Sequence, residues 1–186
     1  HTSMVGGPEG VHLVDTLLSL GVNVKRVFAP EHGFRGDAAN GAHIEDGTDA
    51  ATGLAIFSLH GSNRKPQPSQ LNGIDVVVFD IQDVGARFYT YVSTLMLVME
   101  ACADEGVDVL VLDRPNPHGH HMAGPMLDPD FKSFVGWIPT PMVHGLTLGE
   151  LANMAVAESW FPAPADWQPT VVLCQGWDHG TDYKLP

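Results

Sequence analysis

Side chains capable of acid–base chemistry follow an apolar segment near the start of this chain. The segment at residues 24–29 ends at a proline, and Glu31, His32 and Arg35 come directly after it in a glycine-flanked loop. A glutamate partly walled by apolar neighbours can stay protonated and serve as a general acid near neutral pH. Glu31 is therefore the candidate acid, with His32 orienting it or binding a ligand. The alternatives are a carboxylate paired with Arg35 and a structural histidine.

A second and denser polar stretch, residues 80–91, follows the apolar run at 74–79. It contains two carboxylates, an amide, an arginine and two tyrosines: Asp80, Asp83, Gln82, Arg87, Tyr89 and Tyr91. Carboxylates suit proton transfer, an arginine offers a fork for a carboxylate or for sugar hydroxyls, and tyrosine rings can stack on a sugar. The structural alternative is a helix cap at Asp83 with an ion pair between Asp80 and Arg87.

A third polar cluster follows the apolar run at 107–112, and two prolines restrict its backbone: Asp113, Arg114 and Asn116. His144 precedes a further predicted helix and is another candidate for the same cleft. The histidines at 118–121 invite a metal-binding interpretation, but no zinc-type spacing accompanies them, and a solvated loop is the alternative.

These three clusters must be positioned by a fold in which strands alternate with helices. Apolar runs predict strands near five segments: 24–29, 54–59, 74–80, 108–113 and 170–174. Helical periodicity predicts helices at 11–20 and 88–105, and a capping box at Thr147 and Glu150 predicts another. This alternation is typical of an α/β domain with a doubly wound, mainly parallel sheet, in which ligands bind at the carboxyl ends of the strands.

Two parts of the chain fall outside this alternation. Residues 114–146 form a long proline- and glycine-rich excursion without clear periodicity. Cys102 and Cys174 lie in apolar segments, and we expect both to be buried, inert thiols, since no Cys-x-x-Cys is present.

Composition excludes several classes of protein. Acidic residues outnumber basic ones by 22 to 9, which gives a formal net charge of −13 and disfavours a nucleic-acid partner. The most apolar stretch, residues 92–103, is shorter than the ~20 residues that a membrane span requires. Dinucleotide, Walker and Gly-x-Ser-x-Gly signatures are absent. Clustered carboxylates with arginines and aromatic residues therefore favour acid–base hydrolysis, with glycosides as the natural substrate class.

Four of these motifs together resemble the DUF1343 family, which includes exo-β-N-acetylmuramidases. The resemblance runs along essentially the whole chain and rests on four segments in the right order: 30–36, 80–91, 113–117 and 144–151. It implies a Rossmann-like N-terminal domain followed by a smaller C-terminal domain, with the active site between them. By that resemblance, residues 1–186 correspond to the first domain, trimmed at both ends. His60 and Val143 depart from the family pattern, which expects tyrosine and a basic residue, so substrate preference can differ here.

The resemblance implies a glycoside hydrolase that releases terminal β-linked N-acetylmuramic acid from peptidoglycan fragments. Glu31 would protonate the leaving oxygen, and Asp80 or Asp83 would assist a water unless the acetamido group of the substrate does so. The lactyl carboxylate would be bound by Arg35 or Arg87. The expected substrate-binding residues are His32, Arg35, Gln82, Arg87, Tyr89, Tyr91, Asp113, Arg114, Asn116 and His144.

Such a hydrolase needs no cofactor, and we expect the full-length protein to work outside the cytoplasm with its own C-terminal domain as a partner. Two other classes stay open. A metal-dependent hydrolase would use the histidines at 118–121 with Asp80, whereas a non-catalytic cell-wall-binding domain would tolerate the loss of Glu31. We expect residues 1–186 alone to have little or no activity.

Overall fold

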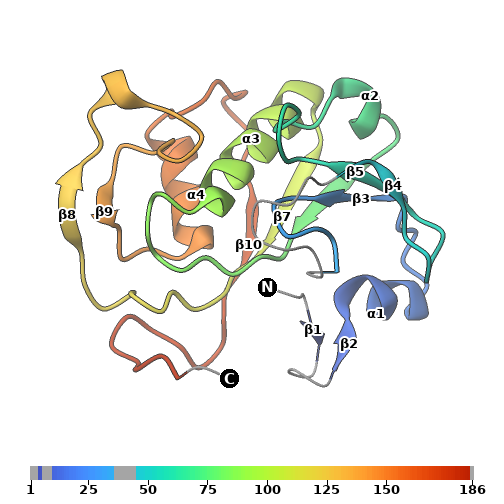
Figure 1. The fold of residues 1–186 in the computed structure, drawn as a ribbon, viewed down its shortest axis with the longest axis horizontal. Coiled ribbons are helices and arrows are strands. Elements are labelled where there is room, and N and C mark those ends of the chain that lie inside the picture. Colours follow the sequence, from blue (N-terminus) through green and yellow to red (C-terminus); the bar gives the residue numbers. More distant parts are fainter. Residues whose placement is uncertain (1–3, 6–9, 36–44, 185–186) are drawn as a thin grey trace. The chain divides into compact units, whose positions relative to one another are not determined.

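The computed structural model describes residues 4–5, 10–35 and 45–184 of the chain (Figure 1). These residues form two compact units, the first ending at Pro66 and the second beginning at Gln67. Each unit has its own three-stranded sheet, and the first described helix lies in the first unit and the remaining ones in the second. Gly36, the last residue of the first motif, lies outside the described residues.

The first unit is built on a sheet with the strand order β3-β5-β4. Its elements are β1 (Met4–Val5), β2 (Val11–His12), α1 (Leu13–Ser19), β3 (Arg26–Ala29), β4 (Gly47–Thr48) and β5 (Ala55–Ser58). β3 and β5 run parallel with Ala29 opposite Ser58, so both strands end at the same edge of the sheet. The antiparallel β4 lies on the other side of β5, and β1 pairs with β2 separately.

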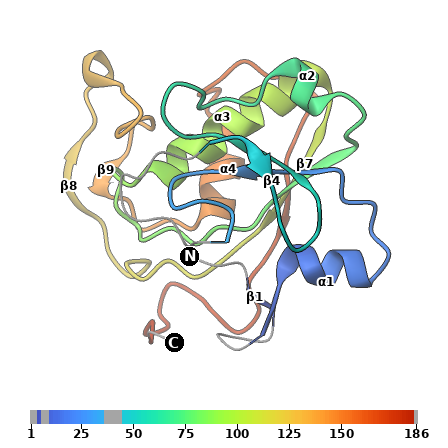
Figure 2. The same ribbon diagram turned by 45° about the vertical axis from the view of Figure 1, so that its right-hand side comes forward.

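The second unit is built on a fully parallel sheet with the strand order β10-β7-β6. Its elements are α2 (Pro68–Leu71), β6 (Val76–Phe79), α3 (Thr90–Glu105), β7 (Asp108–Leu112), β8 (Ala123–Met126), the 3-10 helix η1 (Pro129–Phe131), β9 (Pro141–Val143), α4 (Leu148–Ala157) and β10 (Thr170–Val172). α3 and α4 contact each other and both contact β7, and Figure 2 shows the two helices side by side. β8 and β9 form a separate antiparallel pair.

Helix α3 supplies much of the core of the second unit. Leu95, Met96, Met99 and Cys102 are completely buried, as expected for a helix that is apolar nearly all round. Burial raises the pKa of the Cys102 thiol to about 12, so this cysteine is the inert thiol that its sequence context predicts. The prediction for Cys174 is wrong, because this residue lies beyond the end of β10 and is partly exposed.

The structure confirms the five predicted strands and their parallel pairing within each unit. It corrects two details. β6 is an edge strand and exposes Val76 and Val78, whereas its continuous apolar run predicts burial on both faces. The excursion at 114–146 contains the elements β8, η1 and β9. Each of them has too few residues to show a periodicity in the sequence. A single doubly wound sheet through residues 1–186 stays a prediction.

Among the described residues, no helix is both long enough and apolar enough to cross a membrane.

Candidate active site

Glu31 lies on a tight turn at the carboxyl end of β3. Pro30 is buried, and the amide of Gly33 donates to its carbonyl at 3.1 Å, which closes the turn around Glu31 and His32. His32 has a φ of 73°, in the left-handed region that side chains other than glycine rarely occupy. Backbone strain of this kind persists where the surroundings hold it in place, and it clusters at functional sites. Glu31 and His32 are both half-buried at this edge.

The turn after β5 lies beside the Glu31 turn within the first unit. The amide of Leu59 donates to the carbonyl of Ala29 at 2.8 Å, which places the start of this turn against the end of β3. His60 follows directly and is half-buried. The sequence marks His60 only as a departure from the family pattern. The parallel pairing of β3 and β5 places it beside the Glu31 turn, and for that reason we add it to the candidate site.

Arg35 is held between two carboxylates of the first unit. Its guanidinium donates to Asp15 at 2.8 and 3.0 Å and to Asp49 at 3.0 and 2.7 Å. The hydrogen bonds from Arg35 hold the pKa of the Asp49 carboxyl well below its usual range, and they lower the pKa of Asp15. Such bidentate pairs fix geometry as well as charge. Arg35 therefore ties the loop after β3 to α1, and its binding of a substrate carboxylate stays a prediction.

In the second unit, the residues after β6 and β7 meet at one edge of the sheet, as their parallel pairing predicts. Arg114 Nε and Nη2 lie 2.7 and 2.6 Å from Asp80 Oδ1. Gln82 Nε2 donates to the carbonyl of Pro115 at 2.9 Å. The proposed structural pair of Asp80 with Arg87 is wrong, because Arg114 is the cation that binds Asp80. Two of the three sequence clusters are thus joined by hydrogen bonds.

Asp83 and His144 form a buried pair in the same unit, with 4% and 1% of their surfaces exposed. Asp83 Oδ2 accepts from the amide of Gly85 at 2.7 Å and lies 3.4 Å from His144 Nε2. His144 Nδ1 accepts from the amide of Leu146, which assigns the proton of a neutral imidazole to Nε2, facing Asp83. Among the described residues, Asp83 Oδ1 is buried without a hydrogen-bond partner.

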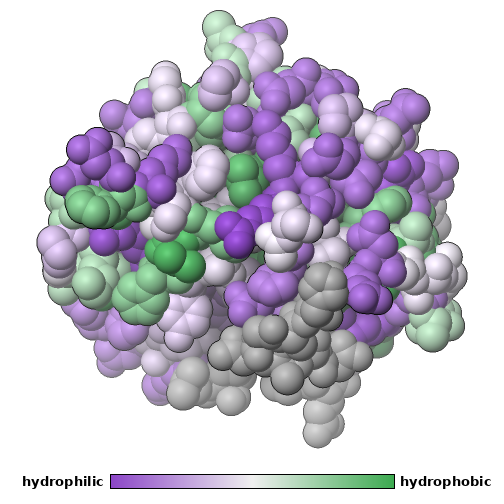
Figure 3. Space-filling view, turned by 45° about the horizontal axis from the view of Figure 1, so that its top comes forward, coloured by the Kyte–Doolittle hydropathy of each residue, from purple (hydrophilic) through white to green (hydrophobic). Residues whose placement is uncertain are grey.

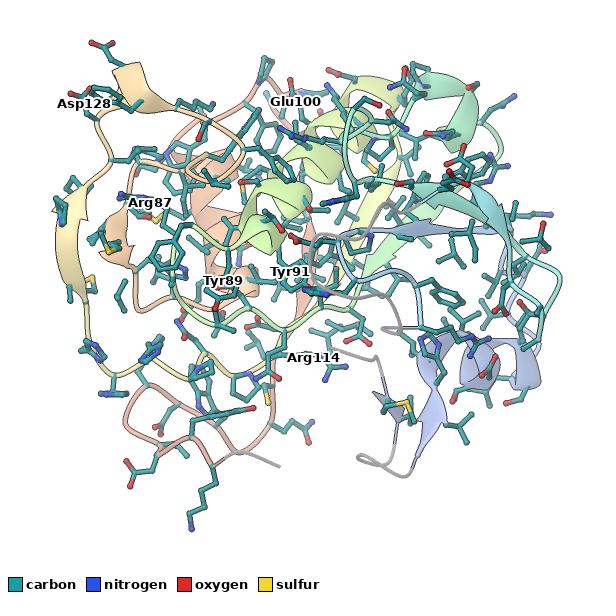
Figure 4. All side chains as sticks on the ribbon, in the orientation of Figure 1. Arg87, Tyr89, Tyr91, Glu100, Arg114 and Asp128 are labelled. Carbon is teal, nitrogen blue, oxygen red and sulfur yellow. The ribbon has the colours of Figure 1, made fainter. Side chains whose placement is uncertain are left out.

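The segment from Arg87 to Tyr91 leads from the strand end into α3. Arg87 donates its side-chain hydrogen bonds to the carbonyls of Pro125 and Thr140 around the β8–β9 pair, the side on which Figure 4 labels it. Tyr89 precedes the helix and is half exposed, whereas Tyr91 lies in the first turn and is buried. The structure therefore presents Tyr89 to solvent and packs Tyr91 into the core.

Asp113 and Asn116 both hold backbone in place. Asp113 accepts from the amide of Gly149 at 2.8 Å and from the Thr147 hydroxyl at 2.7 Å, at the start of α4. The predicted capping box of Thr147 and Glu150 is confirmed in the same turn. Asn116 is buried, donates to the carbonyl of Leu146 and accepts from the amide of His118. Substrate binding by Asp113 and Asn116 stays a prediction.

The histidines that follow this loop do not form a metal site with the rest of the described chain. The ring centroid of His121 lies 5.5 Å from that of His118 and 4.6 Å from that of His120, and all three side chains are exposed. Within residues 4–5, 10–35 and 45–184, no group of three or more histidine, cysteine or acidic side chains is arranged to hold a metal ion. The geometry of this part of the chain therefore gives no support to a metal-dependent hydrolase.

The C-terminal segment is fastened to the second unit through His179. Its Nδ1 lies 2.7 Å from the carbonyl of Gly119 and its Nε2 lies 2.7 Å from Glu150 Oε1. Two acceptors on the two ring nitrogens require the doubly protonated imidazolium. The hydrogen bond with Glu150 accordingly raises the pKa of His179 above its usual value. Tyr183, further along the segment, accepts a hydrogen bond from Gln82.

We expect the attachment of this segment to weaken as the pH rises. Because the folded pKa of His179 is raised, its contribution to stability is complete below the unfolded pKa of about 6.5 and is lost as the pH passes through the folded value. Amide hydrogen exchange of residues 176–183, corrected for intrinsic rates, should therefore show lower protection at pH 9 than at pH 6. A His179→Gln variant should lose that pH dependence, and equal protection of the parent at both pH values would contradict the assignment.

Comparisons with known proteins show the family of this chain. The chain matches the family model described as "Exo-beta-N-acetylmuramidase NamZ, N-terminal" over residues 1–186. It belongs to this family. A curated NamZ relative from Bacillus subtilis strain 168, described as a peptidoglycan beta-N-acetylmuramidase, is 45% identical over 169 residues. That alignment covers 89% of this chain and 40% of the relative.

Two crystal structures of DUF1343 family proteins from Bacteroides fragilis share the fold of this NamZ family member. One has a TM-score of 0.84 at 40% identity and is matched over 93% of this chain and 43% of its own. The other has a TM-score of 0.85 at 44% identity and is matched over 100% of this chain and 48% of its own. The chain thus spans less than half the length of these relatives.

Proposed function

We propose that this chain is the N-terminal part of an exo-β-N-acetylmuramidase that releases N-acetylmuramic acid from the non-reducing ends of peptidoglycan fragments. The NamZ family match over the whole chain carries this proposal, and the 45% identity to the peptidoglycan beta-N-acetylmuramidase of B. subtilis supports it. In this proposal residues 1–186 form a Rossmann-like domain, and the remainder of the protein completes the active site.

Glu31 acts as the general acid and protonates the leaving glycosidic oxygen. Its position on a strained turn at the carboxyl end of a parallel strand, beside His32, supports this role. A sugar leaving group that receives no proton departs as an unstable alkoxide. A carboxylic acid beside the glycosidic oxygen supplies that proton.

The second catalytic group is Asp80 or Asp83, or else the acetamido group of the substrate. Asp80 is already paired with Arg114, so its charge is balanced within the protein. Asp83 keeps one buried oxygen without a partner among the described residues, so it has the capacity to accept a hydrogen bond from a water held at this place. This contrast favours Asp83 over Asp80.

The test is turnover of two aryl β-glycosides by the full-length protein. An aryl β-N-acetylmuramide should be cleaved at least about tenfold faster than the matching aryl β-N-acetylglucosaminide, because only the first carries the lactyl carboxylate. Activity should survive a chelator. Loss of activity on chelation would instead indicate a metal-dependent hydrolase. Binding of peptidoglycan fragments with no cleavage of either glycoside would indicate a non-catalytic cell-wall-binding domain.

A further inference from the structure

Two aromatic side chains stand side by side at the surface of the second unit. Phe88 is 52% exposed and Tyr89 is 48% exposed. Their ring centroids lie 5.6 Å apart with an angle of 33° between the planes. The two neighbouring, half-exposed rings form a small aromatic surface, which we call the aromatic platform. Exposed large aromatic side chains that lie next to each other commonly mark binding sites.

The backbone beneath the aromatic platform is held in place on several sides. The amide of Tyr89 donates to the carbonyl of Ala86 at 3.0 Å, and the amide of Arg87 donates to the carbonyl of Met142 at 2.8 Å. Ala86 also forms a bridge with Val143. The guanidinium of Arg87 adds its hydrogen bonds to the carbonyls near β8 and β9. A platform fixed in this way loses little conformational freedom when a ligand binds.

Exposed apolar side chains also occur in the neighbouring elements β8 and β9 of the same unit. Figure 3 shows hydrophobic side chains among hydrophilic ones at the left of the face it presents, which is the side of β8 and β9 in Figure 1. The exposed apolar residues of the platform, of β8 and β9 and of the residue before β8 are Phe88, Tyr89, Met122, Met126 and Met142. Arg87 is the cation next to the platform in the chain, and its guanidinium is bound by backbone carbonyls.

We propose that Phe88 and Tyr89 stack on the face of a pyranose ring of the peptidoglycan glycan. The C–H bonds of such a ring face give a flat surface with a small positive charge, which suits the negative face of an aromatic ring. The platform begins five residues after Asp83, in the loop at the carboxyl end of β6, where open α/β sheets bind ligands. This inference rests on the proposed function and adds Phe88, which takes the place of the buried Tyr91 as the second stacking ring.

The experiment measures binding and catalysis separately in the full-length protein. Phe88→Ala and Tyr89→Ala are compared with Phe131→Ala, which removes an aromatic ring that is 75% exposed in η1. In a Glu31→Gln background, calorimetry with the disaccharide N-acetylmuramyl-N-acetylglucosamine should give a Kd about three- to tenfold higher for each platform variant. Phe131→Ala should leave the Kd unchanged, and Tyr89→Phe should restore it, since the ring is kept.

In the otherwise unchanged protein, the platform variants should raise KM with little effect on kcat or Tm. An unchanged Kd for Phe88→Ala and Tyr89→Ala would overturn the platform. A lower Tm with an unchanged Kd would also overturn it, because the rings would then pack against the rest of the protein. If the parent binds the disaccharide through the platform but cleaves nothing, the platform stands and the glycosidase proposal fails. If the parent cleaves and the platform variants bind normally, the reverse holds.

Discussion

Glu31→Gln is expected to lower kcat for the disaccharide N-acetylmuramyl-N-acetylglucosamine by about 10²- to 10⁴-fold in the full-length protein. Glutamine keeps the shape and the polar contacts of the side chain at the end of β3 but has no carboxyl proton to transfer. The variant should therefore fold normally and bind the disaccharide with a Kd close to that of the parent. Steady-state kinetics together with a thermal unfolding curve measure both properties.

Substrates with different leaving groups distinguish a general acid from a residue with another role. An aryl glycoside with a weakly basic leaving group needs little protonation, so Glu31→Gln should lose far less activity on that substrate than on the disaccharide. Glu105→Gln, which changes an exposed carboxylate at the end of α3, is the matched control and should leave kcat unchanged. Equal losses on both substrates would show that Glu31 is not the proton donor.

Gly85→Ala is expected to destabilise the protein by about 3 kcal/mol. Gly85 has a φ of +80°, and a Cβ at this position would lie 2.2 Å from Asn116 Oδ1. Asn116 cannot move aside easily, because its amide nitrogen donates to Leu146 and its amide oxygen accepts from His118. Since whole domains are stable by only about 5–15 kcal/mol, a loss of this size should be plain in denaturant unfolding.

Gly73→Ala is the matched control for this substitution. Gly73 has a φ of +72°, similar to that of Gly85, but a Cβ there would meet nothing within 4 Å. It should therefore show only the backbone part of the effect, about 1 kcal/mol. If both substitutions destabilise the protein equally, the close approach of Gly85 to Asn116 is not what holds the loop after β6.

The sequence predicts those parts of the fold that local pattern determines. The apolar runs locate all five parallel strands to within about two residues, because burial requires long stretches of apolar side chains. The capping box at Thr147 fixes the start of α4 to the residue, because the two reciprocal hydrogen bonds demand those side chains at that spacing. The helix predicted at 11–20 begins later, at Leu13, since Val11 and His12 pair with β1.

The partners of the polar side chains are not visible in the sequence. Asp80 could pair with any arginine of its neighbourhood, and only the register of β6 with β7 brings Arg114 to it. The sequence likewise does not show that Asp15 in α1 and Asp49 are the carboxylates that bind Arg35. The platform shows the same limit: helical periodicity does not say that Tyr91 turns inward while Phe88 and Tyr89 stay exposed.

The most direct test of the account is analysis of the products that the full-length protein forms from N-acetylmuramyl-N-acetylglucosamine. Mass spectrometry should detect free N-acetylmuramic acid and N-acetylglucosamine in equal amounts with the parent protein, and neither sugar above background with Glu31→Gln. An intact disaccharide after prolonged incubation with folded parent protein, or equal cleavage by the parent and by Glu31→Gln, would contradict the central claim.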